Sequence, residues 1–234
     1  MKNILILLLA FTPCSAFSQA LELTKTQFVS AATCCTIGQA AIATADKGIL
    51  TVGYSRTSGG VIPSFPLDTS LGNALVVKID SVQHINWAKV FGGSKDDMAM
   101  NACQTADGGY AVLARTTSSD GDITGFKGGP DIWLLRLDAD GNLLWQRTYG
   151  TSQSDLPISI ANTSDGGFII FGCTNGDDGD VSAHYGGFFD FDWIVIKTDG
   201  TGNVQWSRNW VAFAKNTTGE ENNTSQMPIS HFLC

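Results

Sequence analysis

Short apolar runs bounded by glycine, aspartate and asparagine recur along most of this sequence. Residues 110–113 and 168–171 are continuously apolar, which is typical of β-strands that are covered on both faces. Residues 133–137 and 143–148 have the length and composition of further short strands. No long segment has the 3.6-residue apolar period of a helix that packs on one side. The pattern therefore predicts an all-β protein with very little helix.

Glycine-rich turns divide these runs into units of four strands. Asp-Gly-Gly at 107–109 and 165–167 predicts a tight hairpin, because glycine accepts a positive φ and aspartate tolerates it. A loop rich in glycine and aspartate then leads to a third strand, and a turn at 138–142 leads to a fourth. The first strands are expected at 98–104 and 158–162, and the third strands at 133–137 and 193–197.

Three anchors recur in the same order, with successive copies 58 to 61 residues apart. The first is a turn at 44–48, 105–109 and 163–167. The second is a strand end at 76–80, 134–138 and 195–199. The third is a tryptophan seven residues later, at Trp87, Trp145 and Trp206. Such self-similarity identifies a repeat architecture.

Four antiparallel strands at this period describe a β-propeller blade. We expect an all-β fold of β-propeller-like repeats with four-stranded antiparallel blades, in which each tryptophan packs between neighbouring blades. About three blades are present, an incomplete ring, since propellers typically have about 4–8. The predicted units are residues 40–93, a degenerate first repeat, followed by residues 94–150 and 151–210.

The two ends of the chain lie outside these repeats. Residues 1–18 combine Lys2, a short apolar run and a small-residue cleavage site, which predicts a signal peptide and export to the periplasm, cell surface or exterior. Residues 19–39 form an N-terminal segment, and residues 211–234 match nothing upstream and are predicted to be a disordered tail. This tail indicates either a truncated or frameshifted piece of a longer repeat protein, or a subunit that completes its ring by oligomerising.

Charge and cysteine usage exclude several classes of partner. The formal net charge is −8 at pH 7, which argues against nucleic acid and anionic lipid as ligands. No apolar stretch after the signal peptide has the roughly 20 residues of a membrane helix. The cysteines show no CxxC spacing typical of zinc sites and are interpreted as small buried residues, with a bridge between Cys103 and Cys173 as the alternative.

The anchors resemble those of secreted Bacteroidota repeat proteins, whose units carry Thr-x-Asp-Gly-Gly-Tyr, Ser-x-Asp-Gly-Asp-Val and Leu-Asp-x-x-Gly-Asn-x-x-Trp. The second repeat matches best, at 105–110, 119–123 and 137–145. This resemblance implies surface exposure. The hairpin that ends in tryptophan is also similar, one residue short, to a motif of eight-bladed quinoprotein-type propellers, a family that contains dehydrogenases and non-enzymatic assembly factors. Both resemblances imply a fold rather than a reaction.

Two aspartate-rich loops are the candidate metal sites. Carboxylates with glycine between them can wrap calcium through oxygen ligands, and Asp131 and Asp190 close the same loops. The alternative is that these loops are ordinary solvated turns. The turn at 138–142 superficially resembles the start of an EF-hand but is predicted to be a hairpin. The candidate metal ligands are Asp120, Asp122, Asp178 and Asp180.

No catalytic residues and no organic cofactor are predicted. The three histidines, His84, His184 and His231, accompany no Gly-x-Ser-x-Gly elbow, and the glutamates lie outside the repeats. No phosphate-binding glycine fingerprint occurs. A repeated aspartate is better explained by a structural role than by catalysis.

The sequence thus favours an exported, non-enzymatic binding or structural module whose partner is a glycan or a protein at the cell surface. The alternatives are a fragment of a secreted carbohydrate-active enzyme and a quinoprotein-like oxidoreductase fragment. Aromatic residues of the long loops are candidates for contacts with the partner or for packing on the next blade: Phe126, Tyr185, Phe188 and Phe189.

Overall fold

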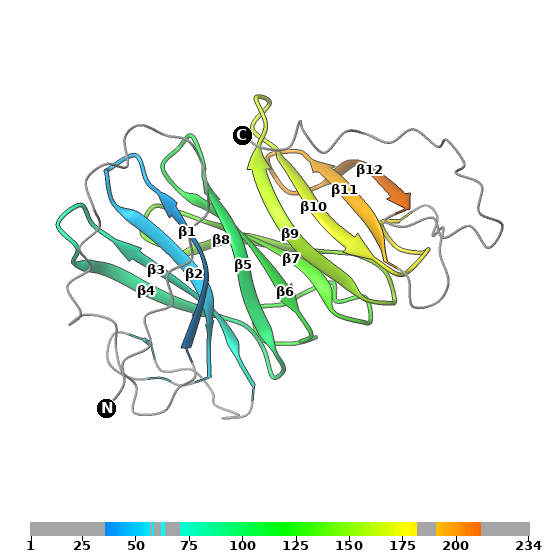
Figure 1. The fold of residues 1–234 in the computed structure, drawn as a ribbon, viewed down its shortest axis with the longest axis horizontal. Coiled ribbons are helices and arrows are strands. Elements are labelled where there is room, and N and C mark those ends of the chain that lie inside the picture. Colours follow the sequence, from blue (N-terminus) through cyan, green and yellow to red (C-terminus); the bar gives the residue numbers. More distant parts are fainter. Residues whose placement is uncertain (1–35, 57, 59–61, 64–70, 182–190, 212–234) are drawn as a thin grey trace, which may run out of the picture.

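The computed structural model describes residues 36–56, 58, 62–63, 71–181 and 191–211, and within them the chain forms twelve strands and no helix (Figure 1). The strands make three four-stranded antiparallel sheets. Blade 1 contains β1 (Thr36–Ala43), β2 (Ile49–Ser55), β3 (Asn73–Ile79) and β4 (Ile85–Phe91). Blade 2 contains β5 (Asp97–Gln104), β6 (Tyr110–Thr116), β7 (Asp131–Leu137) and β8 (Leu143–Tyr149). Blade 3 contains β9 (Asp155–Asn162), β10 (Phe168–Thr174), β11 (Asp192–Thr198) and β12 (Val204–Val211).

The expected fold is confirmed: the chain is all-β, with three blade-like sheets that follow one another in sequence order and do not close on themselves. The strands lie where the sequence patterns predicted them, and several extend further, since β7 starts at Asp131 and β9 at Asp155. No helix capable of crossing a membrane occurs in the part of the chain that the structure describes.

Each blade is a simple meander in which every strand pairs with the next. The first hairpin turns through a residue with positive φ, Gly108 in blade 2 and Gly166 in blade 3, as the Asp-Gly-Gly pattern predicted. In blade 1 the same position holds Lys47 at φ 64°. One extra residue bulges from the first strand of each blade, at the equivalent positions Gln39, Met100 and Ile158. The repeat therefore includes the β-bulge of the first strand as well as the strands and turns.

The first strands of the three blades lie beside one another, with β5 between β1 and β9 (Figure 1). Polar groups join them. The Gln104 side-chain oxygen accepts a hydrogen bond from the Ala45 amide at 2.7 Å, and its backbone carbonyl accepts one from the Asn162 side chain at 2.7 Å. This row of first strands fixes the spacing of the sheets at one side.

Two apolar cores fill the spaces between the sheets. The core between blades 1 and 2 contains residues such as Val52, Val76 and Trp133, and the core between blades 2 and 3 contains Leu113 and Ile170. Every residue of β7 is buried, because blade 2 has a neighbour on each face. This explains the continuous apolar runs of the sequence.

Truncation of a core residue of blade 2 should cost far more stability than truncation of an exposed one. We expect Leu113→Ala to lower the free energy of unfolding by about 2–5 kcal/mol, since Leu113 is fully buried between blades 2 and 3. Leu144→Ala is the control, because Leu144 is 55% exposed, and should cost no more than about 0.5 kcal/mol. Urea unfolding of both variants measures this, and equal costs would contradict the packing described.

Candidate functional site

The first aspartate pair holds the segment through which the chain enters blade 2. We call residues 92–96, between β4 and β5, entry linker 2. Asp120 Oδ1 accepts a hydrogen bond from the Ser94 amide at 2.7 Å, and Asp122 Oδ2 accepts one from the Gly92 amide at 3.0 Å. Gly121 between them has φ +66°, and a Cβ there would lie 2.3 Å from the Gly92 carbonyl oxygen. The loop therefore needs glycine to approach the linker.

The second aspartate pair repeats this arrangement on the segment that enters blade 3, residues 150–154, here called entry linker 3. Asp178 Oδ1 accepts from the Ser152 amide at 2.7 Å, and Asp180 Oδ2 accepts from the Gly150 amide at 3.0 Å. The Lys127 ammonium lies 3.3 Å from Asp180 Oδ2. The two hydrogen bonds are equivalent to those on entry linker 2, and the Lys127 ion pair is an addition in blade 3.

The hydrogen bonds give both pairs a structural role as anionic acceptors. The amides of Ser94 and Ser152 hold the pKa values of Asp120 and Asp178 below the ordinary aspartate value, because they stabilise the charged carboxylates. Among the described residues, no group of three or more His, Cys, Asp or Glu side chains is placed to share a metal ion. Asp190 lies outside the described residues. Calcium binding by these loops stays a prediction.

A second set of aspartates is buried at the starts of strands. Asp97 and Asp155 open β5 and β9, and both are almost completely buried. Asp97 Oδ2 accepts from the Gly93 amide and the Ser118 hydroxyl, each at 2.8 Å. Asp155 Oδ2 accepts from the Thr151 amide at 2.7 Å and its hydroxyl at 3.0 Å. Each entry linker is therefore held by buried as well as exposed carboxylates.

The junction between blades 2 and 3 contains two neighbouring buried carboxyl groups. The Asp155 amide donates to the Pro130 carbonyl at 2.6 Å, which places Asp155 beside Asp131. Asp131 Oδ2 accepts from the Lys127 amide at 2.7 Å. The other oxygen of Asp131, Oδ1, is buried and has no hydrogen-bond partner among the described residues, whereas the Asp155 carboxyl group also interacts with the Thr174 hydroxyl.

Burial raises the pKa of Asp131 to about 7, and the neighbouring Asp155 and Asp180 carboxylates act in the same direction. Burial also raises the pKa of Asp155. The Lys127 ammonium and its amide oppose the shift of Asp131. Asp131 therefore keeps its proton well above the pH at which an exposed aspartate loses it.

The equivalent junction between blades 1 and 2 has one carboxyl group at these two positions instead of two. There the Asp97 amide donates to the Gly72 carbonyl at 2.7 Å, and Asn73 takes the place of Asp131. Asn73 and Asp97 both border Gly92, because a Cβ on Gly92 would lie 2.0 Å from Asn73 Oδ1 and 2.7 Å from Asp97 Oδ2. A neutral amide beside Asp97 removes one of the two negative charges.

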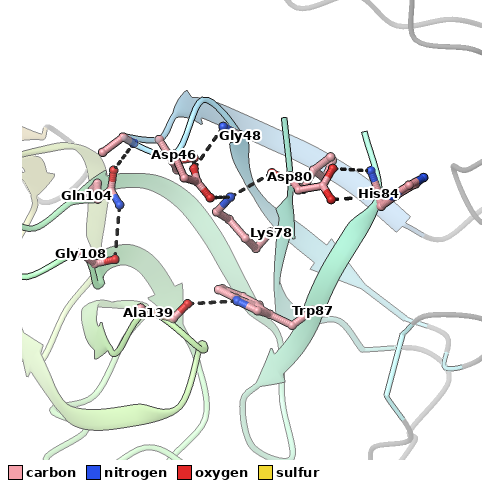
Figure 2. A network of polar contacts seen from close by, with 12 residues as sticks. Asp46, Gly48, Lys78, Asp80, His84, Trp87, Gln104, Gly108 and Ala139 are labelled. Atoms are coloured by element: carbon pink, nitrogen blue, oxygen red, sulfur yellow. Dashed lines mark hydrogen bonds and ion pairs between the residues drawn. The ribbon is translucent and has the colours of Figure 1, made fainter. Parts of the chain in front are cut away.

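Each blade also buries one cation against its first turn, and Figure 2 shows the contact in blade 1. In blade 1, the Lys78 ammonium donates to Asp46 Oδ2 at 2.7 Å and to the Ile79 carbonyl at 3.0 Å. Hydrogen bonds from Lys78 and Thr44 lower the pKa of Asp46 to about 2. The equivalent pairs in the other blades are Arg136 with Asp107 and Lys197 with Asp165. These ion pairs join the first turn to the third strand.

The tryptophan anchors pack between blades as predicted at the two junctions that the structure contains. Trp87 packs against the first core and Trp145 against the second. The Trp87 indole N–H donates to the Ala139 carbonyl of blade 2 at 3.1 Å (Figure 2). Trp206, in the last strand of blade 3, is 41% exposed.

The remaining sequence candidates fall into two groups. Phe126 packs against the core between blades 1 and 2, and Cys103 and Cys173 are free thiols without a bridge. His84 is exposed, and its Nδ1 lies 3.7 Å from Asp80 Oδ2 in the β3–β4 turn (Figure 2). The turn at 138–142 is a hairpin in which Asp138 Oδ1 accepts the Asn142 amide at 2.8 Å. The others lie outside the described residues: Tyr185, Phe188, Phe189, His184 and His231.

No model of a known protein family matches this sequence, and no curated protein is similar to it at a significant level. The interpretation therefore depends on the contacts themselves. Sequence reasoning missed the buried aspartates and the buried cations. The signal was nevertheless present, because Asp97 and Asp155 are one repeat apart, as are Lys78, Arg136 and Lys197.

The substitution Asp122→Ala distinguishes a calcium-binding role of the aspartate loop from its role in holding entry linker 2. We expect Asp122→Ala to lower the free energy of unfolding by about 0.5–1 kcal/mol with or without calcium, because the Gly92 amide loses its acceptor. Asp177→Ala is the control, since Asp177 is an exposed aspartate of the equivalent loop. Thermal unfolding with added calcium or EDTA measures this. A melting temperature that rises with calcium, and does so only when Asp122 is present, would establish the metal site instead.

The Asp131–Asp155 pair predicts an unusual dependence on pH. When the pKa of a carboxyl group is higher in the folded than in the unfolded state, the free energy of unfolding falls as the pH rises between the two pKa values. For Asp131 this range is about pH 4 to 7. We expect Asp131→Asn to raise the free energy of unfolding at pH 8 by about 1–3 kcal/mol and to change it little at pH 4.

Denaturant unfolding of this variant and the wild type from pH 4 to pH 8 measures the effect. Asp140→Asn, in the exposed turn of the same blade, is the control. An Asp131→Asn chain that is less stable than the wild type at pH 8 would refute the raised pKa of Asp131.

Proposed function

We propose that this protein is an exported, non-enzymatic β-propeller-type module that binds or scaffolds at the cell exterior. The observation that supports it is the use of the repeated aspartates. Asp120, Asp122, Asp178 and Asp180 each accept a backbone amide of an entry linker. These carboxylates therefore hold one blade to the next.

The two neighbouring carboxyl groups with raised pKa values, Asp131 and Asp155, are also placed for a structural role. General acid–base catalysis requires a carboxyl group that reaches the substrate. Asp131 and Asp155 have no exposed surface and lie under entry linker 3. A glycoside hydrolase needs two carboxyl groups on either side of an accessible glycosidic bond. This arrangement favours a stabilising role over the alternative of a carbohydrate-active enzyme fragment.

The partner we propose is a glycan or a protein of the cell surface. Export follows from the predicted signal peptide at 1–18, and the repeat anchors resemble those of secreted Bacteroidota proteins. The negative net charge disfavours polyanions as ligands. Loops at the ends of blades are the usual binding surfaces of repeat folds, since a rigid scaffold positions them.

A combined binding and turnover assay tests this proposal. We expect the purified chain to bind at least one glycan or surface-protein fraction on an array without releasing reducing sugar from it. Added pyrroloquinoline quinone should leave the absorption spectrum unchanged, since no quinone site is proposed. Asp131→Asn serves as a matched variant, because binding should survive it. Sugar release by the wild type that this variant abolishes would instead establish a hydrolase.

A further inference from the structure

The two blade junctions share a fixed set of contacts around a tryptophan. Trp87 of blade 1 packs edge-on against Tyr110 of blade 2, with ring centroids 5.9 Å apart. Trp145 of blade 2 packs in the same way against Phe168 of blade 3, at 6.2 Å. In both junctions the accepting aromatic residue is the first residue of the second strand of the next blade.

A glycine in the last turn of the next blade completes each junction. Gly141 and Gly202 have positive φ, and a Cβ there would lie 2.9 Å from a Trp87 ring carbon and 2.7 Å from a Trp145 ring carbon respectively. Contacts this close cannot be accommodated without movement of the indole ring. A blade therefore receives the preceding tryptophan only if its turn carries glycine at this position.

Blade 3 presents the donor half of the same junction. Trp206 is one repeat after Trp145 and is 41% exposed. The outward positions of blade 2 that blade 3 covers, Leu113 and Ile132, are fully buried. Their equivalents in blade 3, Phe171 and Trp193, are only partly buried and lie against one another with ring centroids 5.9 Å apart. The face is apolar at the positions that form the interface elsewhere in the chain.

We propose that this outward face of blade 3 docks a further blade of the same repeat type, one with glycine in its last turn and an aromatic residue at the start of its second strand. Continuity with the two existing junctions supports this occupant. Residues 212–234 contain none of the three repeat anchors, so they do not supply such a blade.

A second copy of this chain is a poor occupant. The blade of a second copy that would have to receive Trp206 is blade 1, where Gln83 occupies the position of Gly141 and Ile49 that of Tyr110. Gln83 already has φ 69°, so its backbone matches but its side chain would meet the incoming indole. The outward residues Leu75 and Ile79 of blade 1 are also buried within the chain itself. The inference goes beyond the proposed function, because this face exists whatever ligand the loops bind.

A tethered blade tests the proposal on the full chain. A second copy of residues 150–211 is appended after Cys234, so that residues 212–234 act as a tether and keep the added blade at high local concentration. We expect the melting temperature to rise by at least about 5 °C. The ¹⁹F signal of 5-fluorotryptophan at position 206, assigned by its loss in Trp206→Phe, should shift to that of a buried ring.

Two variants test the specificity. Gly202→Gln in the added copy alone should abolish both effects, and so should Trp206→Ala in the original blade 3. In the unextended chain, Trp206→Ala should change the melting temperature by less than about 2 °C, because Trp206 is more exposed than Trp87 and Trp145 and no further blade covers it. No effect of the intact added blade would overturn the proposal, and an equal effect of the glutamine variant would overturn the role of the glycine.

Light scattering measures the molecular mass of the unextended chain and thereby tests whether a second copy occupies the outward face of blade 3. We expect a monomer at micromolar concentration. A dimer that Trp206→Ala converts to a monomer would overturn the proposal in favour of a second copy. A chain that fails the glycan assay but buries Trp206 under the tethered blade would disprove the proposed function and support this inference.

Discussion

The structure depends on how the chain crosses from one blade to the next. Each crossing leaves the ladder of one sheet before it enters the ladder of the next, so the linker amides have no strand partner. Aspartate carboxylates accept them in both entry linkers, from exposed loops such as Asp120 and from buried strand starts such as Asp97. The apolar cores can then form, because the linkers hold the sheets at the distance at which side chains interdigitate.

The two blade junctions have equivalent backbone contacts but differ in the number of buried carboxyl groups. Asn73 beside Asp97 leaves one carboxyl group in the first junction, whereas Asp131 beside Asp155 leaves two in the second. Burial raises the pKa of Asp97 in the first junction as well, but only in the second junction do neighbouring carboxylates add to the shift. Repeats that are geometrically equivalent therefore need not respond alike to the pH of their surroundings.

The strands and blades could be predicted because apolar runs, turns and tryptophans recur at one period. The aspartates at 120, 122, 178 and 180 could be selected for the same reason, but not their partners, because a carboxylate beside glycine suits both a cation and a peptide amide. Asp131 was noticed only as the end of a loop. Its raised pKa depends in part on Asp155, which follows it by 24 residues and lies beside it only because blade 3 packs against blade 2.

Gln83 has a consequence for the behaviour of the protein at high concentration. An array whose two ends fit each other can add copies head to tail without limit, and a rotation that does not close yields filaments. With a side chain where the inner turns have only a hydrogen atom, blade 1 cannot accept the exposed tryptophan of a neighbouring molecule. The two ends of the three-blade stack therefore differ, and head-to-tail addition of further copies is disfavoured.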